Sequence, residues 1–289
     1  MIFGKTGQLG WELNRTLAPL ADVVALGPDE LDLVDVDALV RTIHEVQPGL
    51  IVNASAYTAV DEAEREAELA MLLNQKVPMV MAEAARKLKA PFIHYSTDYV
   101  FDGTKTSPYT EEDWTNPLNV YGQSKLKGEQ AIREAGGAFV ILRTSWVYSL
   151  RGNGFVSKVL SWARKQESLK IVTDQVGSPT WARMLAETTS AVVARGFADS
   201  WEYFSERSGV YHLGGAGGVS RFDFTQAILK ADLRPEEQSL KKMEPALTVD
   251  FPTPARRPLY TVLDCSRFER NFGLRLPGWE QALQLALGE

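Results

Sequence analysis

The stretch Gly4-Lys5-Thr6-Gly7-Gln8-Leu9-Gly10 decides the fold of this 289-residue chain. It follows a short apolar run and opens an amphipathic segment, which is the strand–turn–helix setting that a phosphate-binding turn requires. Glycine permits positive φ and a close backbone approach, and the free N–H groups of a helix N-terminus attract a pyrophosphate. The spacing therefore predicts a dinucleotide-binding turn, with an ordinary glycine-rich strand–helix turn as the alternative.

Short apolar runs alternate with longer amphipathic stretches on both sides of this turn. In the first half they predict strands over 22–26, 50–54, 91–96 and 138–143, and helices over 9–20, 36–46, 77–88 and 121–135. In the second half they predict strands over 170–173 and 210–213, and helices over 179–194, 221–231 and 279–287. Only three residues precede Gly4, so we expect either a short first strand or a numbering that starts late.

This alternation predicts an α/β fold with a Rossmann-type, doubly wound parallel sheet. The length of the chain favours a second, smaller α/β domain that binds the substrate. We place the dinucleotide-binding domain at 1–147 and the mainly substrate-binding domain at 148–289. Some segments of the second half are expected to return to the first sheet.

Composition excludes several classes of partner. The net charge of −6 argues against a nucleic-acid or anionic-membrane surface. The chain lacks an apolar run of membrane-spanning length and a signal-like N-terminus, so we expect a soluble, cytoplasmic protein. The single cysteine, Cys265, excludes an internal disulfide and is expected to be a buried apolar residue. The three histidines, His44, His94 and His212, have no ligand spacing, so we expect no zinc site.

Tyr121 and Lys125 are four residues apart and share one face of the helix predicted over 121–135. A nearby ammonium lowers the pKa of a phenol, which makes the phenol a better proton donor to a developing alkoxide. Thr97 ends a predicted central strand, at the sheet edge where ligands of open α/β sheets bind. We therefore expect Thr97, Tyr121 and Lys125 to meet over one crevice.

Together these three residues resemble the Ser/Thr-Tyr-Lys set of short-chain dehydrogenases/reductases. Longer motifs resemble the dTDP-4-dehydrorhamnose reductase family, and the similarity runs nearly from end to end. These motifs are the glycine turn at 4–10, Asn53-Ala54-Ser55-Ala56-Tyr57-Thr58-Ala59-Val60-Asp61, Tyr95-Ser96-Thr97-Asp98-Tyr99-Val100-Phe101, Leu142-Arg143-Thr144-Ser145-Trp146-Val147-Tyr148, Asp174-Gln175-Val176-Gly177-Ser178-Pro179-Thr180 and Ala255-Arg256-Arg257-Pro258.

The resemblance implies the reduction of dTDP-4-dehydro-6-deoxy-L-mannose to dTDP-L-rhamnose with NADPH or NADH, for cell-surface polysaccharide synthesis. It implies that Thr97 orients the carbonyl, that Tyr121 transfers the proton, and that Lys125 tunes the tyrosine and holds the nicotinamide ribose. The residues that it implies for cofactor binding are Gly4, Gly7, Gln8, Leu9, Gly10, Asp32, Leu33, Ala56, Tyr57, Thr58, Tyr95, Tyr121 and Lys125. The residues that it implies for binding the dTDP-sugar are Thr97, Asp98, Trp146 and Arg256.

Departures from the family pattern limit two of these expectations. Gly27 stands where relatives carry an acid for the adenosine ribose, so we expect use of both nicotinamide cofactors. Some relatives form a Mg²⁺-bridged dimer through glutamates, and Glu12 matches one such ligand. Arg183 occupies the region of a second acid, which disfavours the metal, so we expect a monomer or a weak homodimer.

Other readings on this scaffold have distinct signatures. Sugar-nucleotide dehydratases carry Asp-Glu after the threonine, whereas this chain has Asp98-Tyr99, which disfavours elimination of water. Another nucleotide-sugar epimerase or reductase of the superfamily stays open, and an epimerase would consume no net NAD(P)H. A non-catalytic regulatory subunit, like that of methionine adenosyltransferase, also stays open, although Thr97, Tyr121 and Lys125 together favour catalysis.

Overall fold

A six-stranded parallel sheet forms the centre of the molecule, of which the computed structural model describes residues 1–152 and 154–288. The strand order is β10-β5-β4-β3-β1-β2, and every neighbouring pair is parallel. The strands are β1 (Ile2–Phe3), β2 (Ala25–Leu26), β3 (Ile51–Asn53), β4 (Phe92–Thr97), β5 (Phe139–Thr144) and β10 (Gly209–His212). The expected α/β fold with a parallel sheet is confirmed.

The strand order reverses at β1, which pairs with β2 on one side and β3 on the other. Connections that leave a strand pair in opposite directions open a crevice at the carboxyl ends of the strands, and ligands of open α/β sheets bind there. The glycine turn directly follows β1, so this crevice begins at residues 4–7.

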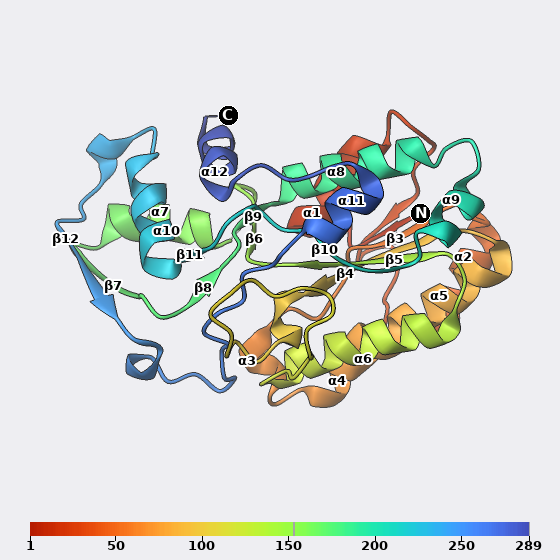
Figure 1. Cartoon of the computed structure of the whole chain (residues 1–289), viewed down its shortest axis with the longest axis horizontal. Coiled ribbons are helices and arrows are strands. Elements are labelled where there is room, and N and C mark those ends of the chain that lie inside the picture. The colour runs from red at the N-terminus through yellow and green to blue at the C-terminus, as the bar shows by residue number, and fades with distance from the viewer. Residues whose placement is uncertain (153, 289) are drawn as a thin grey trace.

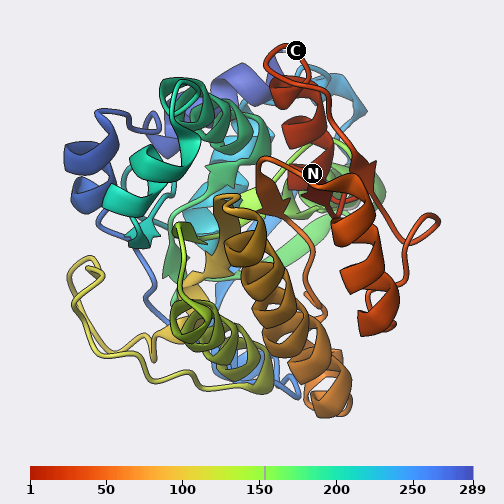
Figure 2. The same ribbon diagram turned by 90° about the vertical axis from the view of Figure 1, so that its right-hand side faces the viewer.

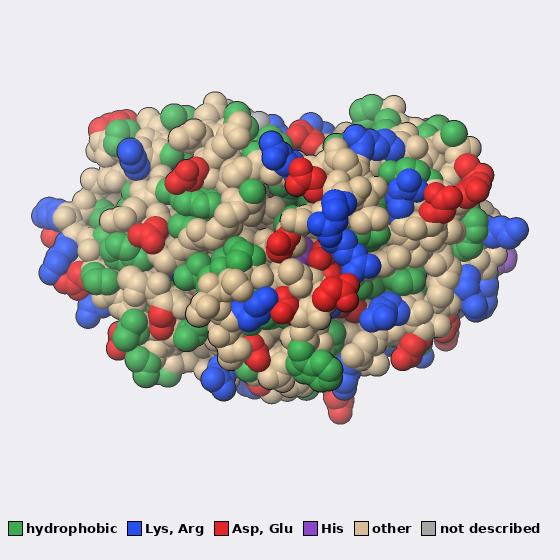
Figure 3. Space-filling view, in the orientation of Figure 1, with side chains coloured by type: hydrophobic (Ala, Val, Ile, Leu, Met, Phe, Trp, Pro, Cys, Tyr) green, Lys and Arg blue, Asp and Glu red, His purple; other side chains and the backbone are tan. Residues whose placement is uncertain are grey.

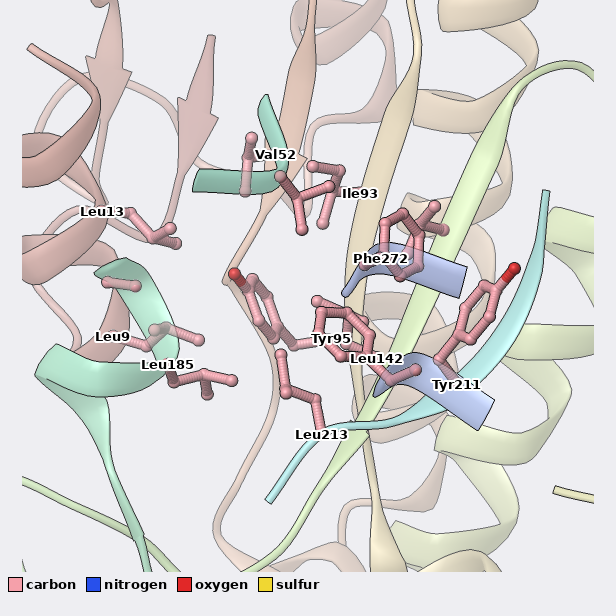
Figure 4. Close-up of a cluster of buried hydrophobic side chains, with 14 of the residues drawn as sticks. Leu9, Leu13, Val52, Ile93, Tyr95, Leu142, Leu185, Tyr211, Leu213 and Phe272 are labelled. Carbon is pink, nitrogen blue, oxygen red and sulfur yellow. The ribbon is translucent and has the colours of Figure 1, made fainter. Parts of the chain in front are cut away.

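Successive residues of the central strands pack against different helical layers, because side chains alternate across a sheet. Ile2, Val52, Ile93 and Val140 face one layer, and Phe3, Ile51, Phe92 and Ile141 face the other. Figure 4 shows the first layer, where Val52, Ile93 and Leu142 lie opposite Leu13 and Leu185. Burial of both faces explains why each of the central strands β3, β4 and β5 begins with consecutive apolar residues.

Helices cover both faces of the sheet (Figures 1 and 2). One layer holds α1 (Gln8–Leu17), α8 (Ala182–Arg195), α9 (Ser200–Glu206) and α11 (Ser266–Phe272). The other holds α2 (Val36–Val46), α5 (Val77–Leu88) and α6 (Val120–Ala135), with α3 (Val60–Ala63), α4 (Ala67–Met71) and the π-helical turn η1 (Leu72–Lys76) near α6.

A smaller lobe lies at the carboxyl end of the sheet, on the left of Figure 1, and has its own apolar core. Its helices are α7 (Phe155–Lys165), α10 (Arg221–Lys230) and α12 (Trp279–Leu287). Its strands form three two-stranded pairs: β6 (Val147–Tyr148) with β9 (Thr180–Trp181), β7 (Ser168–Val172) with β12 (Lys242–Ala246), and β8 (Val176–Gly177) with β11 (Val219–Ser220).

The short 3₁₀ segments are η2 (Asp98–Val100), η3 (Pro235–Glu237) and η4 (Thr248–Asp250). Among the described helices none is long and apolar enough to span a bilayer. On the face drawn in Figure 3, Lys and Arg side chains lie interspersed with Asp and Glu.

Several expected elements differ in their bounds. The helix expected over 9–20 ends at Leu17, because Pro19 has no N–H to continue the helical hydrogen bonds. The helix expected over 179–194 begins only at Ala182, because Thr180 and Trp181 pair with β6. The strand expected over 22–26 is reduced to Ala25–Leu26 at the sheet edge. Helix α7 was not expected; Val156, Val159 and Ala163 form its buried face.

Candidate active site

One large cavity of about 1110 Å³ opens at the carboxyl ends of β1, β3, β4 and β5, and extends to the smaller lobe. Most of the residues expected at the site line this cavity: Gly4, Gly7, Gln8, Leu9, Asp32, Leu33, Ala56, Thr58, Tyr95, Thr97, Asp98, Tyr121, Lys125 and Trp146. Four expected residues are not among the described lining residues: Gly10, Tyr57, Arg256 and the metal candidate Glu12.

The glycine turn packs closely against the next strand connection. Gly4 has φ +88°, and a Cβ there would lie 2.8 Å from the backbone of Ala54. A Cβ at Gly10 would lie 1.9 Å from the carbonyl oxygen of Gly4, so Gly10 shapes the turn from behind. Helix α1 has no side-chain cap at Gly7, which leaves its first N–H groups directed at the cavity edge.

Thr97 and Tyr121 come together because α6 starts against the end of β4. Asn119 caps this helix by accepting a hydrogen bond from the Gly122 N–H at 2.8 Å. A Cβ at Gly122 would lie 2.2 Å from the carbonyl oxygen of Tyr99, so only glycine allows this approach. The rings of Tyr99 and Tyr121 meet edge to face at 5.8 Å, and the phenol of Tyr121 hydrogen-bonds with Thr97.

The protonation of Tyr121 differs from the expectation. Burial raises the pKa of its phenol, and the hydrogen bond with Thr97 acts in the opposite direction. The expected lowering by Lys125 is absent because the lysine nitrogen faces the strand: Nζ donates to the Tyr95 carbonyl at 2.7 Å and lies 3.1 Å from His94 Nε2. Burial lowers the pKa of Lys125 to about 8, and Glu129 partly offsets this.

A buried ion pair joins helix α6 to strand β5. Arg143 binds Glu129 through Nε at 2.9 Å and Nη2 at 2.7 Å, and Ser96 donates to the same carboxylate at 2.5 Å. Both side chains are at most 6% exposed. Sequence reasoning missed Glu129 and Arg143 because their pairing joins α6 to β5, and no spacing in the chain indicates it.

The face toward the smaller lobe combines a carboxylate, an indole and a guanidinium. Asp98 is buried and accepts hydrogen bonds from Thr97 and Ser145, and its burial raises the pKa of the carboxyl. Trp146 adopts φ +45°, and the Arg221 guanidinium stacks on its ring at 3.4 Å. Burial lowers the pKa of Arg221 to about 10. Arg221 was missed because it begins α10, far from every motif in the sequence.

At the other end of the cavity, Asp32 and Leu33 lie beside the end of β2. Lys5 and Glu30 form an ion pair of 2.5 Å there, and Glu30 also accepts the Gly27 N–H at 2.9 Å. Lys5 was not expected at this place, because it lies in the glycine turn and only the pairing of β1 with β2 brings it beside Glu30.

Three of the expected residues have other contacts. Tyr57 hydrogen-bonds Glu66 through its hydroxyl at 2.5 Å, which raises the pKa of the phenol to about 12. Arg256 is exposed, and its backbone carbonyl accepts from Asn119. Glu12 is buried and pairs with Arg15 at 3.0 Å and with Arg183 at 3.6 Å.

The neighbouring Arg257, in contrast to Arg256, points inward. Its Nη2 donates to Asp61 at 2.7 Å, and its charge acts on both Tyr99 and Arg221.

Burial raises the pKa of the Cys265 thiol to about 12. Within residues 1–152 and 154–288, no group of three or more His, Cys, Asp or Glu side chains could hold a metal ion.

Comparison with known proteins gives consistent results. The family described as the RmlD substrate binding domain matches residues 1–289. A dTDP-4-dehydrorhamnose reductase of Burkholderia thailandensis is 42% identical over 99% of this chain and 97% of its own length. The solved structure of a dTDP-4-dehydrorhamnose reductase from Clostridium acetobutylicum has a TM-score of 0.89 and 33% identity, covering 99% of this chain and 97% of that one. Another from Bacillus anthracis, in complex with NADP, has a TM-score of 0.88 and 31% identity, covering 99% and 96%.

Proposed function

The chain belongs to the RmlD family of dTDP-4-dehydrorhamnose reductases, and from this premise we propose that it reduces the C4 keto group of dTDP-4-dehydro-6-deoxy-L-mannose to give dTDP-L-rhamnose. The observation that carries the proposal is that Thr97, Tyr121 and Lys125 line one cavity beside the glycine turn. A binding subunit without activity has no use for a proton donor at this place.

The residues at the first turn fit a nicotinamide dinucleotide. Gly4, Gly7 and Gly10 leave backbone where side chains would fill the space, and the first N–H groups of α1 suit a pyrophosphate. Gln8 Oε1 is buried without a hydrogen-bond partner among the described residues, so it is free to accept from a ligand. When bound, the cofactor supplies the hydride that the C4 carbon of the sugar accepts.

The side chains near the end of β4 supply the proton for the reduction. The Tyr121 hydroxyl donates its proton to the carbonyl oxygen as the alkoxide forms, and the phenolate that remains is reprotonated from water. Thr97, which already hydrogen-bonds with Tyr121, orients the same oxygen. Once the bound cofactor draws its nitrogen away from the Tyr95 carbonyl, Lys125 would hold the nicotinamide ribose and stabilise the phenolate.

The dTDP-sugar fits the side of the cavity that faces the smaller lobe. Asp98 and Trp146 line the cavity there and would contact the pyranose. Arginine suits a diphosphate, because its planar guanidinium donates two charge-assisted hydrogen bonds at once. Arg256 remains our candidate for that role, although its side chain is exposed. Arg221 stacks on Trp146, and the charge of Arg257 acts on Arg221.

The adenosine end supports the use of both NADPH and NADH. Gly27 carries no acid to bind a ribose 2′-hydroxyl. Lys5 would meet a 2′-phosphate once its ion pair with Glu30 opens, and Glu30 would accept from a 2′-hydroxyl. Lys5 would thus bind NADPH, and Glu30 would bind NADH.

A cytoplasmic monomer or weak homodimer fits the remaining features. Glu12 already pairs with Arg15 and Arg183, which disfavours a Mg²⁺-bridged dimer through this residue. Addition of EDTA is therefore expected to leave the activity unchanged.

The proposal is tested by incubating the purified protein with dTDP-4-dehydro-6-deoxy-L-mannose and either NADPH or NADH. We expect stoichiometric loss of absorbance at the reduced-nicotinamide band with both cofactors, and dTDP-L-rhamnose as the product by NMR. Conversion of the sugar without net loss of reduced cofactor would instead identify an epimerase, and absence of any conversion would favour a binding subunit.

A further inference from the structure

The segment that links the sheet to the smaller lobe returns to the glycine turn. Between β6 and α7, Arg151 lines the same cavity as Gly7 and Gln8. A Cβ at Gly154, the residue before α7, would lie 2.9 Å from Gln8 Oε1. This segment therefore lies against the start of α1, where the pyrophosphate of the proposed cofactor would bind.

The side chain of Arg151 is oriented by stacking. The buried Ser149 hydroxyl accepts a hydrogen bond from the Arg151 N–H at 2.8 Å, which fixes the backbone. The Arg151 guanidinium carbon lies over the indole of Trp11, 3.8 Å from the ring centroid. A Trp face attracts a guanidinium without using its five N–H donors, which lie in the guanidinium plane. The donors of Arg151 therefore stay available for a ligand.

Trp11 determines where this guanidinium lies. The indole also lines the cavity, and the Trp11 N–H donates to the Gly7 carbonyl at 3.0 Å, so this residue belongs to the first turn of α1. Helical side chains lean toward the N-terminus of their helix. The indole consequently leans toward the uncapped N–H groups after Gly7 and brings the Arg151 guanidinium toward them.

Arg151 differs from the other cations near the cavity in having no acceptor. Lys125 and Arg151 are the cationic side chains among the described residues that line the cavity. The Lys125 nitrogen donates to the Tyr95 carbonyl, and Lys5 is paired with Glu30. The Arg151 guanidinium forms no hydrogen bond or ion pair with any residue that the structure describes.

We propose that Arg151 binds the pyrophosphate of the nicotinamide cofactor, and that Trp11 holds the guanidinium in place before the cofactor binds. Two guanidinium N–H groups would donate side by side to phosphate oxygens, in charge-assisted hydrogen bonds. The first N–H groups of α1 would bind the same pyrophosphate from the side of the glycine turn. This inference rests on the proposed cofactor site and adds a residue from outside the glycine motif.

The assigned ligand group makes a specific prediction about the two cofactors. The 2′-phosphate is present in NADPH alone, whereas the pyrophosphate is common to NADPH and NADH. Arg151 should therefore contribute the same factor to the affinity for each cofactor. Lys5, which we place at the 2′-phosphate, should affect the affinity for NADPH alone.

The test is calorimetric titration of the full-length protein with NADPH and with NADH, in the absence of any sugar nucleotide. In Arg151→Met the aliphatic stem is kept and the charge is lost, so both dissociation constants should rise about tenfold. Lys5→Met should raise the constant for NADPH alone. The matched control is Arg234→Met, which removes an exposed arginine of the smaller lobe that pairs with Glu237. Both constants should then stay within about twofold of the wild type.

Unchanged dissociation constants in Arg151→Met would refute the proposal. A loss confined to NADPH would move Arg151 to the 2′-phosphate, and a loss confined to dTDP, titrated in the same way, would move it to the sugar nucleotide. Either result overturns the assignment to the pyrophosphate. A protein that binds both cofactors through Arg151 but reduces no keto sugar would reject the proposed reaction and keep this inference.

The role of Trp11 is tested with a double-mutant cycle. Trp11→Leu should weaken the binding of both cofactors about threefold, but have much less effect in the Arg151→Met background, because the two residues share one interaction. Additive losses would show that Trp11 does not act through Arg151. Arg151→Met decides the binding role by itself, whether or not Trp11→Leu folds.

Salt provides a readout that a merely structural role of Arg151 would not move. Because salt screens exposed charges, the dissociation constants of the wild type should rise more steeply with KCl concentration than those of Arg151→Met. Equal slopes in the two proteins would contradict a contact between the guanidinium and a phosphate.

Discussion

At the scale of single residues, the Tyr121 hydroxyl is the group on which the proposed chemistry depends. Tyr121→Phe removes the proton donor while keeping the ring that meets Tyr99 edge to face. General acid catalysis contributes about 10²–10⁴ in rate, so kcat should fall by a factor in this range. The measurement is steady-state reduction with saturating NADPH.

The control for this variant is the cofactor affinity, which fluorescence quenching measures. Because the Tyr121 phenol hydrogen-bonds with Thr97 rather than with the glycine turn, the dissociation constant of NADPH should change less than about threefold. Near-native kcat in a folded variant would remove Tyr121 from the chemistry.

Residues of the site could be predicted from the sequence where one continuous motif carries them. Thr97, Asp98, Tyr121 and Lys125 lie in two such motifs, and all four line the cavity. His94 precedes Thr97 by three residues, yet its contacts are with Asn53 of the neighbouring strand and with Lys125 of α6. Contacts of this kind are set by the register between elements, which a single sequence does not specify.

At the scale of elements, the start of α6 determines how close Tyr121 comes to Thr97. Gly122→Ala places a methyl group 2.2 Å from the Tyr99 carbonyl oxygen, and this backbone cannot give way cheaply. Overpacking of this kind costs about 1–3 kcal/mol, so the midpoint of urea unfolding should fall accordingly. The helix start should also shift, and kcat should fall by about tenfold or more.

Gly49→Ala is the matched control, because a Cβ at Gly49 meets nothing within 4 Å. Its stability should stay within about 0.5 kcal/mol of the wild type, with unchanged kcat. If both alanine variants behave alike, the close approach at Gly122 has no role in placing the tyrosine.

Helices with strong periodicity were predictable to the residue. The helices expected over 36–46, 77–88 and 279–287 have those bounds in the structure. The π-helical turn η1 was not predictable, since it continues α4 into α5 without a break in the sequence pattern. It directs Asn74 at the backbone of Tyr57, with hydrogen bonds of 2.9 and 3.0 Å, and thereby holds the loop after β3 near α6.

At the scale of the whole molecule, the ion pair between Asp61 and Arg257 joins the helical layer of the sheet to the segment that follows the smaller lobe. Asp61→Asn should release Arg257 from its position near Tyr99 and Arg221. A partly buried pair of this kind is worth about 1 kcal/mol, so KM for the sugar nucleotide should rise about fivefold. The comparison is with the Kd of NADPH, which should stay within about twofold.

The arrangement of the two lobes was only partly predictable. Parallel strands and crossover helices follow from the alternation of patterns, because each strand needs helices on both faces. The pairing of the short strands β6, β8, β9 and β11, each of two residues, leaves no periodic signal.

If the Kd for NADPH weakens as much as the KM for the sugar nucleotide rises in Asp61→Asn, the ion pair between Asp61 and Arg257 stabilises the molecule generally.

The path of the chain after residue 147 limits how this scaffold can be recombined. Strand β10 completes the sheet beside β5, and α8 covers Leu9 and Leu13 of α1. A hybrid enzyme joined once at that point would take β10 from the second protein. It would also take from that protein the helix α8 that covers Leu9 and Leu13. Exchange of sugar preference between relatives must therefore transplant the lobe as separate insertions, with β10, α8 and α11 kept from the recipient.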